Sequence, residues 1–263
     1  MTDENAEQAW TQVEQEIERW RAAGQRPRMF LRDDDAVTVT PALERLVNLV
    51  HRHKAPLLLA SIPSMTDDKL GVLVRDELLI VGAVHGWAHV SHAPVGEKPC
   101  ELGSHRPLET VLEELRQGRE RLIGLFGWVS DLLVPPWNRI EDTVLEHIGQ
   151  AGFGGVSAHG WPERPLPARQ VNAHVDIVHW LAGRVGRDLN WIYEELARNL
   201  AEARRHGFRA VGILTHHLAH DERAWASLDA LMQRMADEGA TWVAADNLLG
   251  EAEAPAATNG ARI

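Results

Sequence analysis

The sequence has little of several features that mark common classes of protein. Its 263 residues include one cysteine, Cys100, which excludes a disulfide bond within the chain. No apolar run approaches the roughly 18 residues of a membrane span, and the acidic start Met-Thr-Asp-Glu lacks the basic and then apolar pattern of a secretory signal. The net charge of −11 opposes non-specific binding to nucleic acid. We therefore expect a cytoplasmic protein with neither a membrane nor a nucleic acid as partner, and the sequence leaves its oligomeric state open.

What the sequence does contain is a regular alternation of helical and extended patterns. Apolar residues recur at helical spacing in residues 7–21, 41–53, 67–74, 108–125, 141–151, 189–205 and 221–236. Short apolar runs predict strands at residues 28–35, 56–60, 79–84, 131–134, 155–158, 171–180, 210–215 and 241–244. Such alternation is typical of an α/β fold with a mainly parallel sheet. We expect one domain over residues 1–250, with an N-terminal helix and a disordered tail at 251–263.

Polar clusters follow the last apolar residue of five predicted strands. They are Asp33 to Asp35, His85 with His89, Pro135 to Arg139, Asp176 to Trp180, and His216 with His217. In a (β/α) barrel the carboxyl ends of all strands meet at one face, where catalytic groups gather. The clusters therefore favour a barrel over an open doubly wound sheet.

Two histidines four residues apart suggest a metal site. His85 ends an apolar strand, and a turn or short helix after it would bring His89 to the same side. Two neutral imidazoles suit zinc and similar divalent metals, which usually require at least one further protein ligand. The acids Asp33 to Asp35 are the candidates for that ligand.

The sequence resembles the polysaccharide deacetylases with NodB homology, carbohydrate esterase family four. Five motifs in order, across about residues 30–219, carry the resemblance. They are Asp34-Asp35, His85-Gly-Trp-Ala-His89, Pro135-Pro136-Trp137, Asp176-Ile-Val-His-Trp180 and Leu214-Thr-His216. The resemblance implies a distorted (β/α)₇ barrel and metal-assisted removal of an N-acetyl group from a small-molecule or oligosaccharide substrate.

The resemblance also implies roles for individual residues. Asp35, His85 and His89 would hold the metal, with zinc expected and cobalt or nickel as alternatives. Asp34 would be the general base, His216 would protonate the leaving amine, and the backbone N–H of Trp137 would bind the oxyanion.

Three departures from the family pattern leave alternatives open. Val134 stands where the family has an arginine that orients the base, so Arg139 is a candidate replacement. Asp33 replaces a phenylalanine, which allows a shifted register with Asp33 as base and Asp34 as ligand. His179 replaces a second acid, which leaves Asp176 to orient His216.

Each cluster also has an ordinary structural interpretation. The three acids could cap the following helix, although Thr40 is nearer its start, and the histidines could be partly buried core residues. Two other functions also stay open. One is a barrel that has lost catalysis and binds a carbohydrate or small ligand, and the other is a cyclic amide or imide hydrolase with the same metal site.

Overall fold

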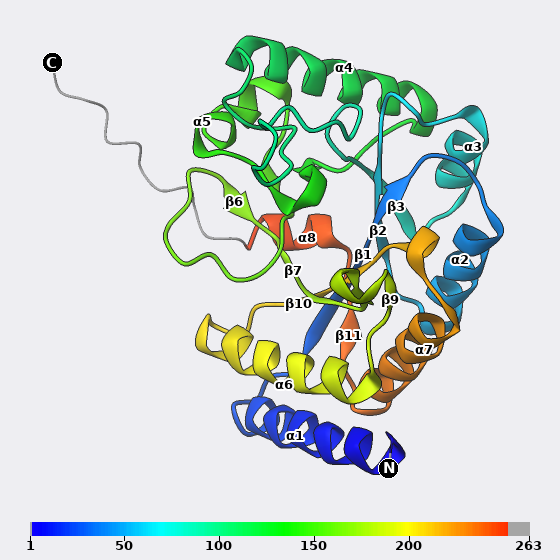
Figure 1. Ribbon diagram of the computed structural model, residues 1–263. Coiled ribbons are helices and arrows are strands. Elements are labelled where there is room, and N and C mark those ends of the chain that lie inside the picture. Colours follow the sequence, from blue (N-terminus) through cyan, green and yellow to red (C-terminus); the bar gives the residue numbers. More distant parts are fainter. Residues whose placement is uncertain (1, 252–263) are drawn as a thin grey trace, which may run out of the picture. The chain divides into compact units, whose positions relative to one another are not determined.

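A computed structural model describes residues 2–251 of the protein (Figure 1). The tail predicted at 251–263 lies, apart from Glu251, outside the described residues. Across the part described, no helix combines the length and the apolar content needed to cross a membrane. The chain forms two compact units, each built from separate stretches of sequence. The first unit comprises Met1–Asp34, Thr40–Leu57 and Ala173–Ala244, and the second comprises Asp35–Val39, Leu58–Asn172 and Ala245–Ile263.

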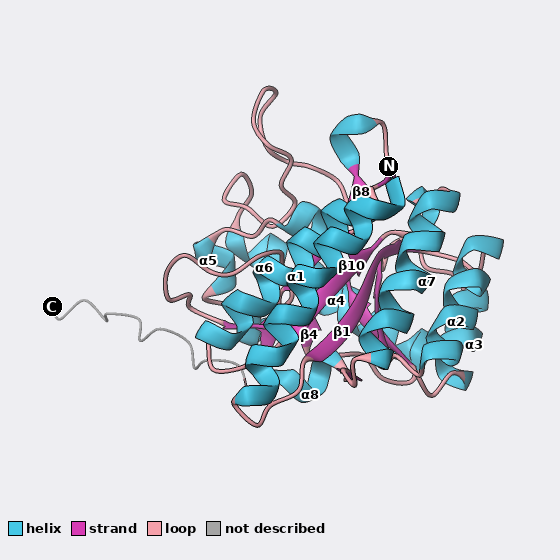
Figure 2. Ribbon diagram, turned by 90° about the horizontal axis from the view of Figure 1, so that it is seen from below, coloured by secondary structure: helices cyan, strands magenta, loops and turns pink. Residues whose placement is uncertain are grey.

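Parallel strands form the centre of the first unit. Its strands are β1 (Arg28–Ala36, which runs on into the second unit), β7 (Ala173–Asp176), β10 (Val211–Thr215) and β11 (Thr241–Trp242). The order is β1-β10-β7, with β11 also on β1, and β1 lies beside β10 in Figure 2. A short antiparallel pair, β8 (Val178–His179) and β9 (Val185–Gly186), follows β7. The register sets Asp33 opposite Thr215, so the polar end of β1 meets the polar end of β10.

Four helices cover the first unit: α1 (Thr2–Ala22), α2 (Pro41–His53), α6 (Leu189–Arg205) and α7 (Glu222–Asp237). Helices α1 and α6 pack side by side (Figure 1), where the Trp20 side chain is fully buried and its indole donates to Leu200 O at 3.1 Å. Helix α2 begins where the sequence predicts, because the Thr40 hydroxyl accepts a hydrogen bond from Leu43 N and Pro41 occupies the first turn.

The second unit has its own parallel strands, in the order β6-β5-β4-β3-β2. These are β2 (Leu57–Ser61), β3 (Ile80–Val84), β4 (Leu132–Leu133), β5 (Gly155–Val156) and β6 (Arg169–Gln170). The helices are α3 (Asp68–Asp76), α4 (Leu108–Phe126), α5 (Asp142–Leu145) and α8 (Ala245–Leu249). Helix α4 packs on β3 at Gly82, where an added Cβ would lie 2.3 Å from the Phe126 ring, so this close approach requires glycine.

The predicted fold class is confirmed: the protein is α/β, a distorted (β/α)₇ barrel with an N-terminal helix. The single domain over residues 1–250 stays a prediction. Two predicted elements are wrong in extent. The helix expected at 141–151 stops at Leu145, because His147 leaves helical geometry (φ −113°, ψ 0°), and a separate 3₁₀ turn covers Ile148–Ala151. The strand expected at 171–180 is interrupted after Asp176, whose carboxylate accepts a hydrogen bond from Val178 N at 2.9 Å.

Candidate metal centre and catalytic residues

Asp35, His85 and His89 lie together in the second unit and form a group that could hold a metal ion. Each offers one ligand atom, and these atoms all lie within 4.8 Å of one another. Asp35 Oδ1 is 3.2 Å from His85 Nε2 and 3.4 Å from His89 Nε2. One carboxylate oxygen and two imidazole nitrogens make a donor set that suits zinc or a similar cation. The carboxylate in this group belongs to Asp35 and not to Asp34, which the shifted alternative would require as the ligand.

The hydrogen bonding of His85 prepares its Nε2 atom for a metal. Its side chain is almost fully buried, and its Nδ1 lies 2.9 Å from Val134 O. A carbonyl oxygen can only accept, so Nδ1 carries a proton, and in a neutral ring the lone pair of Nε2 would then face Asp35 Oδ1. Two acceptor atoms 3.2 Å apart repel each other unless a cation lies between them or His85 is protonated. The residues present therefore fit a divalent cation.

His89 reaches the group through a turn and not through a helix. The residues after His85 form a bend, with left-handed φ values of 65° at Gly86 and 55° at His89. The prediction of a turn is confirmed, and the alternative of a short helix is wrong. Glu101, farther along the same loop between β3 and α4, stabilises the turn, because its carboxylate accepts hydrogen bonds from the backbone N–H groups of Trp87, Ala88 and His89. Burial raises the pKa of Glu101, and the three donors oppose that rise.

Trp137 lies beside the same group. Its ring centroid is 4.2 Å from that of His89. The backbone at Trp137 and Asn138 is left-handed, with φ values of 55° and 57°, in a 3₁₀ turn set by Pro135 and Pro136. The two turn hydrogen bonds are donated by Asn138 N and Arg139 N, and neither uses the N–H of Trp137.

Asp34 is paired with Arg32, which the sequence motifs do not single out. Both side chains are buried in β1 of the first unit, with exposed fractions of 0% for Arg32 and 2% for Asp34. Arg32 Nε donates to Asp34 Oδ1 and Arg32 Nη2 to Oδ2, each at 2.9 Å. Residues i and i+2 of a strand share a face, so alternation along β1 was the available signal. Arg139, the predicted partner, donates to Pro99 O at 3.1 Å in the second unit.

Asp33 fixes the start of the histidine-bearing turn after β10. Its carboxylate accepts hydrogen bonds from Thr215 Oγ1 at 2.7 Å and His217 N at 2.8 Å, and it lies 2.5 Å from His217 Nδ1. Burial alone would raise the pKa of Asp33, but His217 and the hydrogen bonds outweigh it and the pKa lies below its ordinary value. These contacts give Asp33 a structural role in the first unit.

His216 lies next to this turn and near Asp34. Its Nε2 is 3.9 Å from Asp34 Oδ2, too far for a direct hydrogen bond but close enough for both groups to serve one reacting centre. The Trp180 ring contacts the His216 ring edge-on, with centroids 4.6 Å apart. Asp176 accepts a hydrogen bond from the Trp180 indole at 2.8 Å. Asp176 therefore contacts Trp180, and Trp180 in turn contacts His216.

His220 is a further histidine of the first unit. Its Nε2 lies 3.4 Å from His216 N, and its ring packs on Trp225 with centroids 4.3 Å apart. Burial lowers the pKa of His220 to about 4. The neutral ring therefore acts as an acceptor for the backbone of His216.

The predicted site residues thus fall into two groups. Asp35, His85, His89, Trp137 and Arg139 belong to the second unit, and Asp34, Asp176 and His216 belong to the first. The peptide bond between Asp34 and Asp35 joins the groups, so the predicted base and the predicted acidic ligand are neighbours in the chain.

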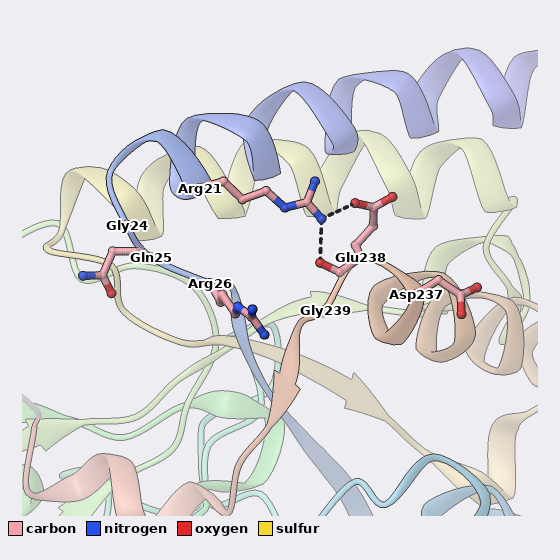
Figure 3. A pocket seen from close by; sticks show the side chains of 7 residues that line it. All are labelled: Arg21, Gly24, Gln25, Arg26, Asp237, Glu238 and Gly239. Carbon is pink, nitrogen blue, oxygen red and sulfur yellow. Dashed lines mark hydrogen bonds and ion pairs between the residues drawn. The ribbon is translucent and has the colours of Figure 1, made fainter.

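A separate hollow in the first unit contains none of the predicted residues. Figure 3 shows it between the end of α1 and the segment after α7, lined by Arg21, Gly24, Gln25, Arg26, Asp237, Glu238 and Gly239. Arg21 pairs there with the side chain and the carbonyl oxygen of Glu238, both at 2.8 Å. The pairing of opposite charges gives this hollow no evident chemistry.

Comparison with known proteins gives structural relatives only. No family model and no curated protein matches the sequence. The Bc1960 peptidoglycan N-acetylglucosamine deacetylase is 18% identical, with a TM-score of 0.56 over 82% of this chain and 85% of that one. A family 4 acetyl xylan esterase from Clostridium thermocellum, solved with a cobalt ion, is 13% identical, with a TM-score of 0.55 over 85% and 91%. The chain has the fold of the family 4 carbohydrate esterases.

The predicted resemblance to this family is thereby confirmed for the fold. Identities this low do not establish an activity for the protein. A third structure with the family 4 esterase fold is a BA3943 mutant described as a pseudoenzyme, 12% identical, with a TM-score of 0.57 over 84% of this chain and 67% of that one. The fold alone therefore does not determine the function.

Proposed function

We propose that the protein is a metal-dependent hydrolase that removes an N-acetyl group from a carbohydrate or a related soluble amide. The observation that carries the proposal is the grouping of Asp35 Oδ1 with the Nε2 atoms of His85 and His89. Three protein ligands with coordination positions left over are characteristic of catalytic metal sites. The side chains of Asp35 and His89 are 32% and 21% exposed, so solvent and a substrate have access to this group.

These three residues would hold the metal, with zinc expected and cobalt or nickel as alternatives. A divalent cation supplies a Lewis acid that polarises an acetyl carbonyl and makes water more acidic. The hydrogen bond from His85 Nδ1 to Val134 O fixes the tautomer that this role requires.

Asp34 is the proposed general base. The two hydrogen bonds from Arg32 fix the plane of the Asp34 carboxylate, while its remaining lone pairs can accept a proton from the attacking water. Arg32 would thus take the orienting role for which Arg139 is the candidate from the sequence.

His216 is the proposed general acid, because it lies 3.9 Å from Asp34 and so can serve the same reacting centre. It would donate a proton to the leaving amine, and Trp180 in contact with it would fix the ring. The N–H of Trp137 would donate to the oxyanion. The exact substrate and the cytoplasmic location stay predictions.

The test is an assay of acetate release from N-acetylglucosamine and its oligomers. Metal-free protein would be supplied with zinc, cobalt or nickel, beside Asp35→Ala as the matched control. We expect release that depends on added metal and is absent in the control. Release that is equal without metal, or equal in Asp35→Ala, would refute the proposal.

A second function is favoured by the departures at Val134 and His179 and by the pseudoenzyme among the structural neighbours. In this case the protein would bind metal and a carbohydrate or small ligand without releasing acetate. Calorimetric titration with the same sugars, beside the acetate assay, separates a binding protein from an enzyme. Ring opening of cyclic amides or imides, with no acetate from any sugar, would identify the third alternative.

A further inference from the structure

Glu101 is a buried carboxylate in the second unit that no predicted role explains. It lies in the loop between β3 and α4 with an exposed fraction of 1%. Its Oε1 accepts from Trp87 N at 3.3 Å and Ala88 N at 2.8 Å, and its Oε2 accepts from His89 N at 3.2 Å. A buried carboxylate is unfavourable unless such donors compensate for the lost water. Its three donors belong to one turn, and that turn carries a proposed metal ligand.

The turn has a backbone shape that requires support. His89 has a left-handed φ of 55°, which is uncommon for a residue other than glycine and is kept only where the surroundings impose it. Gly86 opens the turn with a φ of 65°, and a Cβ there would lie 2.1 Å from Glu101 Oε2. The turn is therefore built around the carboxylate, and Glu101 fills the space that a side chain at Gly86 would need.

The ligand geometry depends on this turn. His85 is held independently, by its ring bond to Val134 O and by the bond from its own N–H to Ser61 O. His89 Nε2 reaches within 3.4 Å of Asp35 Oδ1 only because the backbone reverses between the two histidines. A change in that turn would move the His89 ring while leaving His85 in place.

We propose that Glu101 is a positioning residue that sets His89 in coordinating reach of the metal held by Asp35 and His85. The proposal rests on the metal site of the proposed function. It assigns Glu101 the task of fixing a ligand through the backbone of that ligand. It also explains why the Glu101 carboxylate, 12 positions after His89 in the chain, is buried against three consecutive backbone N–H groups.

The matched control is Glu141, which acts on the same loop without touching the histidine turn. Its carboxylate accepts a hydrogen bond from Ser104 N at 3.0 Å. Glu141→Ala therefore removes a carboxylate that anchors this loop and leaves the three donors of the turn in place. A merely structural role of the loop would make the two glutamates equivalent.

The experiment measures zinc dissociation constants by competition with a chelator for wild type, Glu101→Ala, Glu101→Gln and Glu141→Ala. The visible spectrum of the cobalt-loaded proteins reports the ligand geometry. Groups that support metal ligands typically change affinity by about 10–100-fold, so we expect that loss in Glu101→Ala, with an altered cobalt spectrum. Glu101→Gln keeps one acceptor oxygen but turns an NH₂ group toward the turn, so a smaller loss is expected. Glu141→Ala should match wild type in both measurements.

Each outcome decides between the claims. Wild-type affinity and an unchanged cobalt spectrum in Glu101→Ala would overturn the role of Glu101 while leaving the metal site intact. If Glu101→Ala does not fold, wild-type affinity in Glu101→Gln would overturn it instead. Equal losses in Glu101→Ala and Glu141→Ala would reduce Glu101 to a loop anchor and also overturn the proposal. Absence of zinc binding by the wild-type protein would refute the metal site itself. That result would show that the proposed function fails, and not only the role of Glu101.

Discussion

Replacing Arg32 by methionine tests the buried ion pair of β1 through the stability of the protein. The Asp34 side chain is 2% exposed, and the change removes the Arg32 guanidinium, which donates two hydrogen bonds of 2.9 Å to it. Removing one partner of a buried ion pair costs about 3–5 kcal/mol, because the other charge stays buried and uncompensated. We therefore expect the free energy of unfolding of Arg32→Met to fall by about that amount.

Urea unfolding of metal-free protein at pH 7, followed by circular dichroism, measures this loss. The control is Arg223→Met, since the pair of Arg223 and Asp188 at 2.7 Å is 56% and 71% exposed and such pairs contribute about 0–1 kcal/mol. The double variant Arg32→Met/Asp34→Asn should recover about 1–3 kcal/mol, since it removes the stranded charge. A loss in Arg32→Met no larger than in Arg223→Met, or no recovery in the double variant, would refute the reasoning.

Three further predictions concern the site. Asp34→Asn should retain zinc and lower turnover by about 10²–10⁴-fold, whereas Asp35→Ala should lose zinc, as measured by metal analysis and acetate release; equal zinc loss in both would show that the acids are misassigned. His216→Ala should lower kcat with its zinc content unchanged, and a loss of zinc would instead make His216 a ligand. For His220, burial lowers the pKa from 6.5 to about 4, so the unfolded chain takes up a proton first as the pH falls. Urea unfolding should therefore show stability lost between about pH 6.5 and 4, by about 3 kcal/mol at most, and His220→Gln should flatten this slope; an unchanged slope in that variant would refute the assignment.

The parts of the fold that local signals control were predictable from the sequence. Helix α2 matches its predicted bounds because the Thr40 cap and Pro41 define its start. Helix α6, expected at 189–205, matches equally well, since its apolar positions hold helical spacing up to the turn at Gly207. The strand expected at 171–180 is shorter than predicted, because the Asp176 side chain accepts a hydrogen bond from Val178 N just after β7. Such competition by a side chain is invisible to hydrophobic periodicity.

The candidate site was predictable where one segment carries the pattern. The spacing of His85 and His89, with an acid at a strand end, pointed to the group that the structure brings together. Arg32 could have been found from its alternation with Asp34 along β1. No local pattern identifies Glu101, because tertiary packing determines which carboxylate of the loop accepts hydrogen bonds from the turn.

The central claim is that Asp35, His85 and His89 hold one divalent ion, and an anomalous difference map from zinc-soaked crystals tests it most directly. Data collected on both sides of the zinc absorption edge should show one strong peak at about 2.0–2.2 Å from Asp35 Oδ1 and from both Nε2 atoms. Zinc found elsewhere on the protein, with no anomalous density among these three side chains, would contradict the account.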